Sequence, residues 1–153
     1  MKHLFFVMII LLSGQACRQR VDLEKEKDAL MMLHEQQRQA HLSKNVSLLL
    51  GDNLTDYVEV NRGVIGRPKN SESKKRFQSY FNSVDFVSWD DVTPPVFTFS
   101  DDGTMATSVV DKVVITRSRS EPAQIDTAYY AWLAVFKKVD GKWRMHRMGS
   151  TNK

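Results

Sequence analysis

The second half of the chain consists of alternating segments joined by tight turns, and this pattern restricts the fold most. Asp102-Gly103 and Asp140-Gly141 are two-residue turn signals of the kind that join antiparallel neighbours. Polar and apolar residues alternate on both sides of these turns, which is typical of strands with one buried face. The expected strands cover residues 84–89, 96–100, 105–116, 127–138 and 142–149. The sequence therefore predicts an antiparallel sheet in this half.

The first half has a different periodicity. Apolar residues recur at spacings of three, four and seven through 22–42, with Asp22 placed to cap the start of a helix. A second long helix is expected at 71–83, and residues 54–60 predict a strand between the two. Helices gathered on one face of an antiparallel sheet make an α+β domain.

The N-terminus predicts export. Lys2 precedes the apolar run 4–12, and small residues follow before Cys17. This order is typical of a signal peptide, and the run is shorter than the roughly 20 residues that span a bilayer. Cys17 at the cleavage edge resembles the acylated cysteine of bacterial lipoproteins. We therefore expect a membrane-anchored lipoprotein of a bacterial cell envelope, with a secreted or periplasmic soluble protein as the alternative. The expected parts are a signal peptide at 1–16, a tether at 17–21 and one domain at 22–150.

Charge and cysteine content argue against a nucleic-acid-binding protein and against a disulfide-stabilised one. The formal net charge is +4, and it falls to about +3 without Lys2. Nucleic-acid binding would need a larger basic footprint, so we expect no nucleic-acid partner. Cys17 is the only cysteine, so no disulfide can form within the chain. Stability must then come from the hydrophobic core, for which 8 Phe, 4 Tyr and 3 Trp are available.

The Asp140-Gly141 turn predicts which residues share a face of the sheet. Its register sets Phe136, Trp132 and Tyr130 toward the helices. The same register sets three apolar residues on the opposite face: Leu133, Val135 and Met148. That face would suit a homodimer, or it is simply a partly covered outer surface.

At this level of detail the chain resembles a known superfamily. The element order, the runs 48–63 and 71–81, and the Asp140-Gly-Lys-Trp143 turn are similar to the nuclear transport factor two-like superfamily. The resemblance spans roughly residues 22–150. The members of this superfamily include ketosteroid isomerases and polyketide cyclases. The resemblance implies a cone: a curved antiparallel sheet, as in cystatin-like folds, that wraps the N-terminal helices and leaves a pocket for a small apolar molecule.

The sequence lacks part of the catalytic pattern of the isomerase-like members. Their base is a carboxylate on the first strand, and the resemblance places Val60 at that position. Glu59 is adjacent, and a one-residue step in a strand points to the other face, so we expect Glu59 to face away from the pocket. Asp111 lies inside an apolar strand and is a weak catalytic candidate, with an outer-face position as the alternative.

The function expected from these patterns is binding of a small apolar ligand or of a partner. The residues expected to line the ligand site are Tyr57, Trp89, Tyr130 and Trp132. An acid–base enzyme of the isomerase or cyclase type is the alternative. His34 and His41 are about two helical turns apart, too far to share a metal directly, and no nucleotide or metal motif occurs. We therefore expect no cofactor and no metal.

Overall fold

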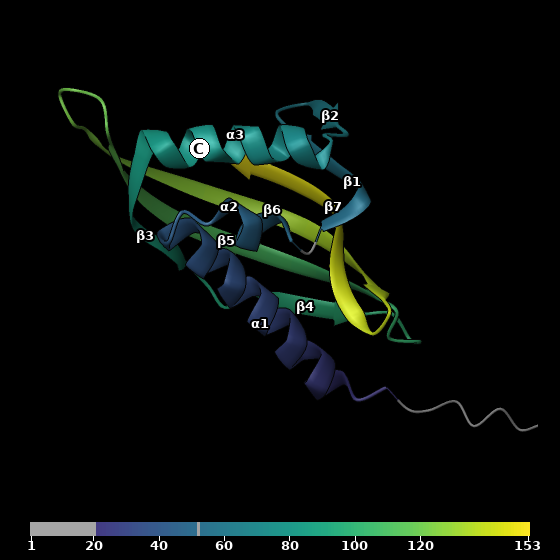
Figure 1. The fold of residues 1–153 in the computed structure, drawn as a ribbon. Helices are drawn as coiled ribbons and strands as arrows, with labels where there is room; N and C mark the ends of the chain where they lie inside the picture. The colour runs from purple at the N-terminus through teal and green to yellow at the C-terminus, as the bar shows by residue number, and fades with distance from the viewer. Residues whose placement is uncertain (1–20, 52) are drawn as a thin grey trace, which may run out of the picture.

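The computed structural model describes residues 21–51 and 53–153, so the predicted signal peptide and the Cys17 lipidation site lie outside the described residues. Three helices lie against one face of a curved seven-stranded sheet (Figure 1). The helices are α1 (Leu23–Leu42), α2 (Val46–Leu50) and α3 (Asn70–Ser83). The first strands are β1 (Asn53–Asn61), β2 (Val64–Gly66), β3 (Val84–Asp91) and β4 (Val96–Phe99). The last three are β5 (Met105–Ser118), β6 (Ile125–Val139) and β7 (Lys142–Asn152). The predicted α+β cone is confirmed, and β7 continues two residues past the predicted domain end.

Local capping explains where α1 and α2 begin. The Asp22 carboxylate accepts a hydrogen bond from the Lys25 backbone N–H at 3.2 Å, as the sequence predicts. The Asn45 side chain accepts from the Leu48 N–H at 3.0 Å and starts α2 in the same way. Both caps satisfy donors that have no partner within the helix.

The sheet order is β2-β1-β7-β6-β5-β3, with β4 paired to β5. All pairs are antiparallel except β1 and β7, which run parallel and join the first strand to the last. The Asp140-Gly141 prediction holds: both residues have positive φ, 50° and 74°, and Val139 pairs with Lys142 across a two-residue turn. Gly103 also has positive φ, at 64°, but the prediction of a two-residue turn there is wrong, because β4 ends at Phe99, β5 begins at Met105, and the loop between them is longer. Glycine adopts this backbone conformation without steric cost.

The core lies between the helices and the inner face of the sheet. Its larger cluster contains Leu30 of α1, Ala134 and Phe136 of β6, and Trp143 of β7. A smaller cluster of Val46, Leu50 and Phe81 joins α2 to α3. As predicted, the Phe136 face of β6 is the one that meets the helices.

The prediction that Met148 shares a face with Leu133 and Val135 is wrong. The pairing is as predicted near the turn, with Phe136 opposite Met145, but it shifts between Val135 and Phe136. Beyond the shift, Met148 pairs with Ala134 and packs on the core. A β-bulge places two residues opposite one and so reverses the face of everything after it. Leu133, which is 50% exposed, remains on the outer face, and the homodimer stays a prediction.

Candidate functional site

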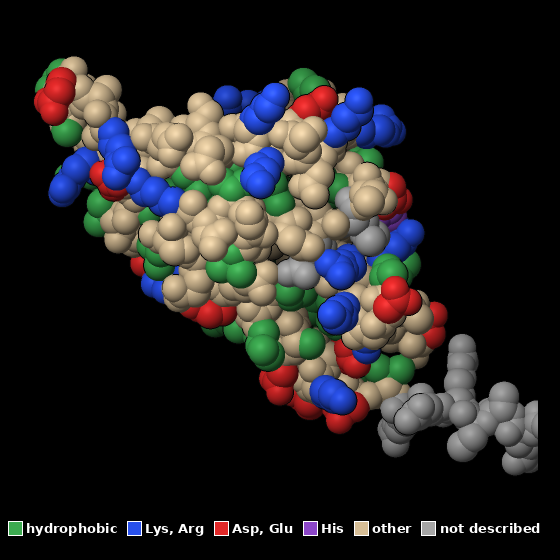
Figure 2. Space-filling model, in the orientation of Figure 1, with side chains coloured by type: hydrophobic (Ala, Val, Ile, Leu, Met, Phe, Trp, Pro, Cys, Tyr) green, Lys and Arg blue, Asp and Glu red, His purple; other side chains and the backbone are tan. Residues whose placement is uncertain are grey.

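A cavity of about 260 Å³ lies between the helices and the inner face of the sheet. Figure 2 shows a band of hydrophobic side chains in the groove between α3 and α2. Six aromatic side chains line the cavity: Tyr57, Phe77, Tyr80, Trp89, Tyr130 and Trp132. They come from β1, α3, β3 and β6, so four elements of the cone contribute to one aromatic wall. Amide and hydroxyl side chains, among them Asn53, Asn61 and Ser150, add polar groups.

The four residues predicted to line a ligand site all lie on this cavity. Tyr57, Trp89, Tyr130 and Trp132 are separated by up to 75 positions in the chain, yet the fold brings them together. Strand alternation explains the β6 pair, because Tyr130 and Trp132 are two residues apart and point to the same side. Trp89 and Trp132 have ring centroids 5.9 Å apart and form one continuous surface.

Asp111, the catalytic candidate, does not line the cavity. Its carboxylate accepts hydrogen bonds from the Thr93 backbone N–H at 3.0 Å and the Thr93 hydroxyl at 2.7 Å. Those contacts cap the turn that follows β3 and place Asp111 on the outer face. The next residue along β5, Lys112, occupies the inner face instead and is fully buried.

Glu59 lines the cavity, so the prediction that it faces away is wrong. Alternation along β1 sets Tyr57, Glu59 and Asn61 on the inner side, while Val60 points outward and is 44% exposed. Arg76 of α3 holds both carboxylate oxygens of Glu59, at 2.5 and 2.9 Å. This two-pronged ion pair neutralises the one carboxylate that the described residues bring to the cavity.

His41 brings an imidazole to the same cavity. Its Nδ1 donates to the Gln37 carbonyl at 2.7 Å, and its ring stacks on Trp89 with centroids 4.4 Å apart. Phe81 and Phe86 contact the imidazole edge-on. Burial among these rings lowers the pKa of His41 to about 4. The imidazole is therefore neutral near pH 7 and offers Nε2 as an acceptor.

The lowered pKa of His41 predicts a pH-dependent stability. The unfolded chain takes up a proton below the ordinary pKa of 6.5, whereas the folded protein takes it up only near 4. Stability from this group is complete above pH 6.5 and decreases as the pH falls toward 4, by roughly 3 kcal/mol. Urea unfolding at several pH values measures this decrease. His41→Phe should make the decrease shallower, and an unchanged pH profile in the variant would rule out His41 as its source.

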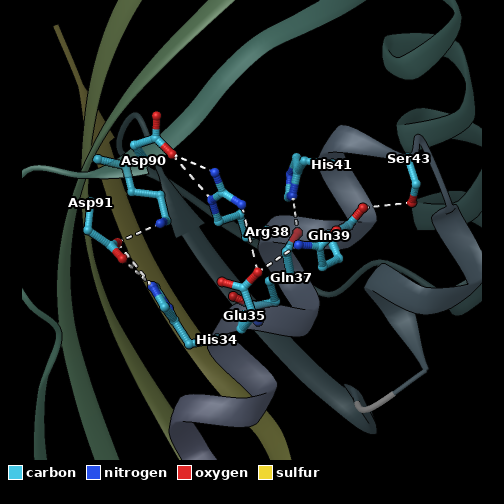
Figure 3. A network of polar contacts seen from close by, with 10 residues as sticks. His34, Glu35, Gln37, Arg38, Gln39, His41, Ser43, Asp90 and Asp91 are labelled. Carbon is cyan, nitrogen blue, oxygen red and sulfur yellow. Dashed lines mark hydrogen bonds and ion pairs between the residues drawn. The ribbon is translucent and has the colours of Figure 1, made fainter.

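A polar network behind Trp89 was not predicted from the sequence. His34 Nε2 lies 2.9 Å from an Asp91 carboxylate oxygen (Figure 3). Lys112 Nζ donates to the same carboxylate at 2.5 Å. The ammonium also lies 3.9 Å from the centroid of the Trp89 ring. Burial lowers the pKa of Lys112 and of His34, and the contacts with Asp91 oppose that effect. Lys112 and His41 therefore both position Trp89, which forms part of the cavity wall.

Residues 21–51 and 53–153 contain no group of three metal-ligating side chains. None of the helices in the described part of the chain is both long and apolar enough to cross a bilayer.

The architecture can be compared with solved structures. A nuclear transport factor two-like superfamily protein from Salmonella enterica superimposes with a TM-score of 0.71 at 12% identity, covering 84% of this chain and 92% of that one. The chain has the nuclear transport factor two-like fold. A ketosteroid isomerase-like protein from Erwinia carotovora (TM-score 0.62, 14% identity, 84% and 96% coverage) and LinA (0.70, 11%, 86% and 88%) share it. No family model matches the sequence. No curated protein matches it either.

Within the nuclear transport factor two-like fold, the site has a definite chemical character. The cavity is aromatic and close to neutral, because Glu59 and Arg76 cancel and His41 is uncharged. Proteins with this fold include one described as ketosteroid isomerase-like and one of unknown function, so the fold does not decide between binding and catalysis.

Proposed function

We propose that this protein is an exported binding domain for a small, neutral, largely apolar ligand. The observation that carries the proposal is the aromatic cavity, in which Glu59 is paired with Arg76 and the His41 imidazole is uncharged. An apolar cavity of about 150 Å³ holds one benzene ring. A cavity of about 260 Å³ therefore suits a molecule of one to two rings.

The Tyr57 hydroxyl adds a polar requirement. Tyr57 is only 9% exposed, and its hydroxyl has no hydrogen-bond partner among the described residues. Burial raises the pKa of this phenol, so it remains a donor at neutral pH. No fully buried side-chain oxygen or nitrogen of the described residues lacks a partner, so this hydroxyl is reachable from the cavity. It can therefore donate to a ligand carbonyl or hydroxyl. The ligand we propose is accordingly flat and apolar, with one hydrogen-bonding oxygen.

Native mass spectrometry of the protein, purified gently from the cells that produce it, tests this proposal. We expect a co-purifying small molecule in the unchanged protein and its loss in Tyr130→Ala. Tyr129→Ala is the matched control, because Tyr129 is the adjacent tyrosine, is 46% exposed and lies on the other face. A protein that carries no molecule, or equal occupancy in both variants, would contradict a ligand site in the cavity.

An acid–base enzyme is the second candidate, since Glu59 and Tyr57 lie on the same cavity. Its weakness is that Arg76 occupies both oxygens of Glu59. The molecule released from the protein distinguishes the two functions. Returned to excess protein, a bound ligand keeps its chromatographic retention and NMR spectrum, whereas a substrate is converted, and Glu59→Gln should then abolish the conversion.

We further propose that the domain is exported and held on a bacterial membrane by a lipid on Cys17. The apolar run 4–12 followed by the single cysteine supports this. Fractionation of cells should place the unchanged protein with the membranes and Cys17→Ala in the soluble fraction. Membrane association that persists in Cys17→Ala, together with an unacylated N-terminal peptide, would contradict lipid anchoring.

A further inference from the structure

One segment accounts for the whole net positive charge of the chain. Residues 59–76, which form the β1–β2 hairpin and the start of α3, contain six Lys or Arg and two Glu, a net of +4. The whole chain also has a formal charge of +4, so the remaining residues are balanced. Both carboxylates in the segment already have partners: Glu59 forms an ion pair with Arg76, and Glu72 accepts a hydrogen bond from the Lys69 backbone N–H at 3.0 Å.

The free cations surround an exposed apolar tip. Val64 and Ile65 of β2 are 66% and 62% exposed, and Val60 lies directly opposite Ile65 across the hairpin. Figure 2 shows the basic side chains gathered over β2 and the adjacent end of α3. The cations without an ion pair to any described residue are Arg62, Arg67, Lys69, Lys74 and Lys75. Apolar residues at a tip with cations behind them match an anionic bilayer, whose acyl region and headgroups take up the two kinds of side chain.

The hairpin is built to hold this tip rigidly. Arg62 and Gly63 both have positive φ, 49° and 76°, which is the backbone of a two-residue type I′ turn. On its other side β1 is hydrogen-bonded to β7, so the hairpin is anchored to the main sheet. The tip projects at the edge of the molecule in Figure 1.

We infer that the β1–β2 hairpin and the first turns of α3 form a docking surface for anionic lipid bilayers. The surface does not depend on the lipid proposed for Cys17, because its charge and apolar tip lie wholly within the folded domain. The same segment supplies Glu59, Asn61 and Arg76 to the cavity. Docking therefore brings the cavity next to the bilayer. This consequence for ligand entry rests on the proposed ligand site, whereas the docking surface does not depend on it.

Vesicle co-sedimentation tests the docking surface. A chain that starts at Val21 contains every described helix, strand and core contact, so it can be used without the signal peptide and Cys17. We expect it to sediment with vesicles of equal parts phosphatidylglycerol and phosphatidylcholine, to remain free with phosphatidylcholine alone, and to be released by high salt. Absence of binding to the anionic vesicles overturns the proposal and leaves the ligand test unaffected.

Matched variants locate the surface. Lys74→Gln with Lys75→Gln should weaken the partition at least about tenfold, since each basic side chain near an anionic surface contributes several-fold. Lys25→Gln with Lys27→Gln, the same charge change at exposed positions of α1, should have little effect. Ile65→Ser should also reduce binding, whereas Ile125→Ser, at a strand position that is 65% exposed, should not. Equal losses in the hairpin and control variants, with unchanged melting temperatures, overturn the assignment of the surface to this hairpin.

Discussion

Lys112→Ala is expected to lower the free energy of unfolding by about 3–5 kcal/mol, a change large enough to unfold a marginal domain. The Lys112 side chain is completely buried, donates to Asp91 and lies over the Trp89 ring. Its removal leaves the Asp91 carboxylate, of which 27% is exposed, with His34 as its one remaining partner among the described residues. It also opens a void beneath Trp89. Urea or thermal unfolding measures the loss.

Lys138 provides the matched control for this prediction. It too lies on the sheet, pairs with a carboxylate (Glu26, 2.5 Å) and lies 5.5 Å from a tryptophan ring centroid (Trp143). Its side chain is 25% exposed, so Lys138→Ala should cost only about 1 kcal/mol. Lys112→Met, which keeps the apolar stem, separates lost packing from lost charge. Equal costs for Lys112→Ala and Lys138→Ala would contradict burial as the source of the difference.

Phe81→Ala should lower the free energy of unfolding by a similar amount, about 3–5 kcal/mol, because Phe81 is fully buried in a cluster that has few other members. The ring touches Phe77 and Phe86 and forms the contact between α3 and α2. Chemical denaturation measures the loss, and Phe81→Leu should recover part of it by filling most of the volume.

Tyr129→Ala is the control for the aromatic deletion. Tyr129 is 46% exposed, and its removal should change stability by less than about 1 kcal/mol. A loss for Phe81→Ala no larger than that of Tyr129→Ala would show that α3 is held by something other than the Phe81 cluster. Phe81→Ala should also reduce occupancy of the cavity, because α3 carries Phe77, Tyr80 and Arg76 into its wall.

The parts of this molecule that follow from local pattern could be predicted from the sequence. The strands around Asp102-Gly103 and Asp140-Gly141 follow from turn chemistry, and α1 follows from its periodicity and the Asp22 cap. Tyr130 and Trp132 could be assigned to the inner face because a strand alternates sides from a fixed turn.

Two kinds of feature could not be predicted from the sequence. One is the face on which a residue lies after a shift in strand pairing, and the other is a contact between elements that are distant in the chain. The bulge near Phe136 moves Met148 to the core, and no residue type in that stretch signals it. Asp111 and Lys112 are both charged residues in an apolar strand, and only the tertiary structure shows that the lysine points inward. Its partners, His34 and Asp91, come from a helix and another strand, so the network has no sequence motif.

The parallel pairing of β1 with β7 has a consequence for how the protein acquires its fold. Val58 pairs with Arg147, so the chain must close a loop of about 90 residues before this contact forms. Such non-local contacts slow folding, because the entropy of closure is lost before the contacts compensate for it. During synthesis, β1 cannot find its partner until β7 has left the ribosome. The hairpin beyond β1 therefore has no sheet to join until β7 has been made, and a truncation that removes β7 would detach that entire edge.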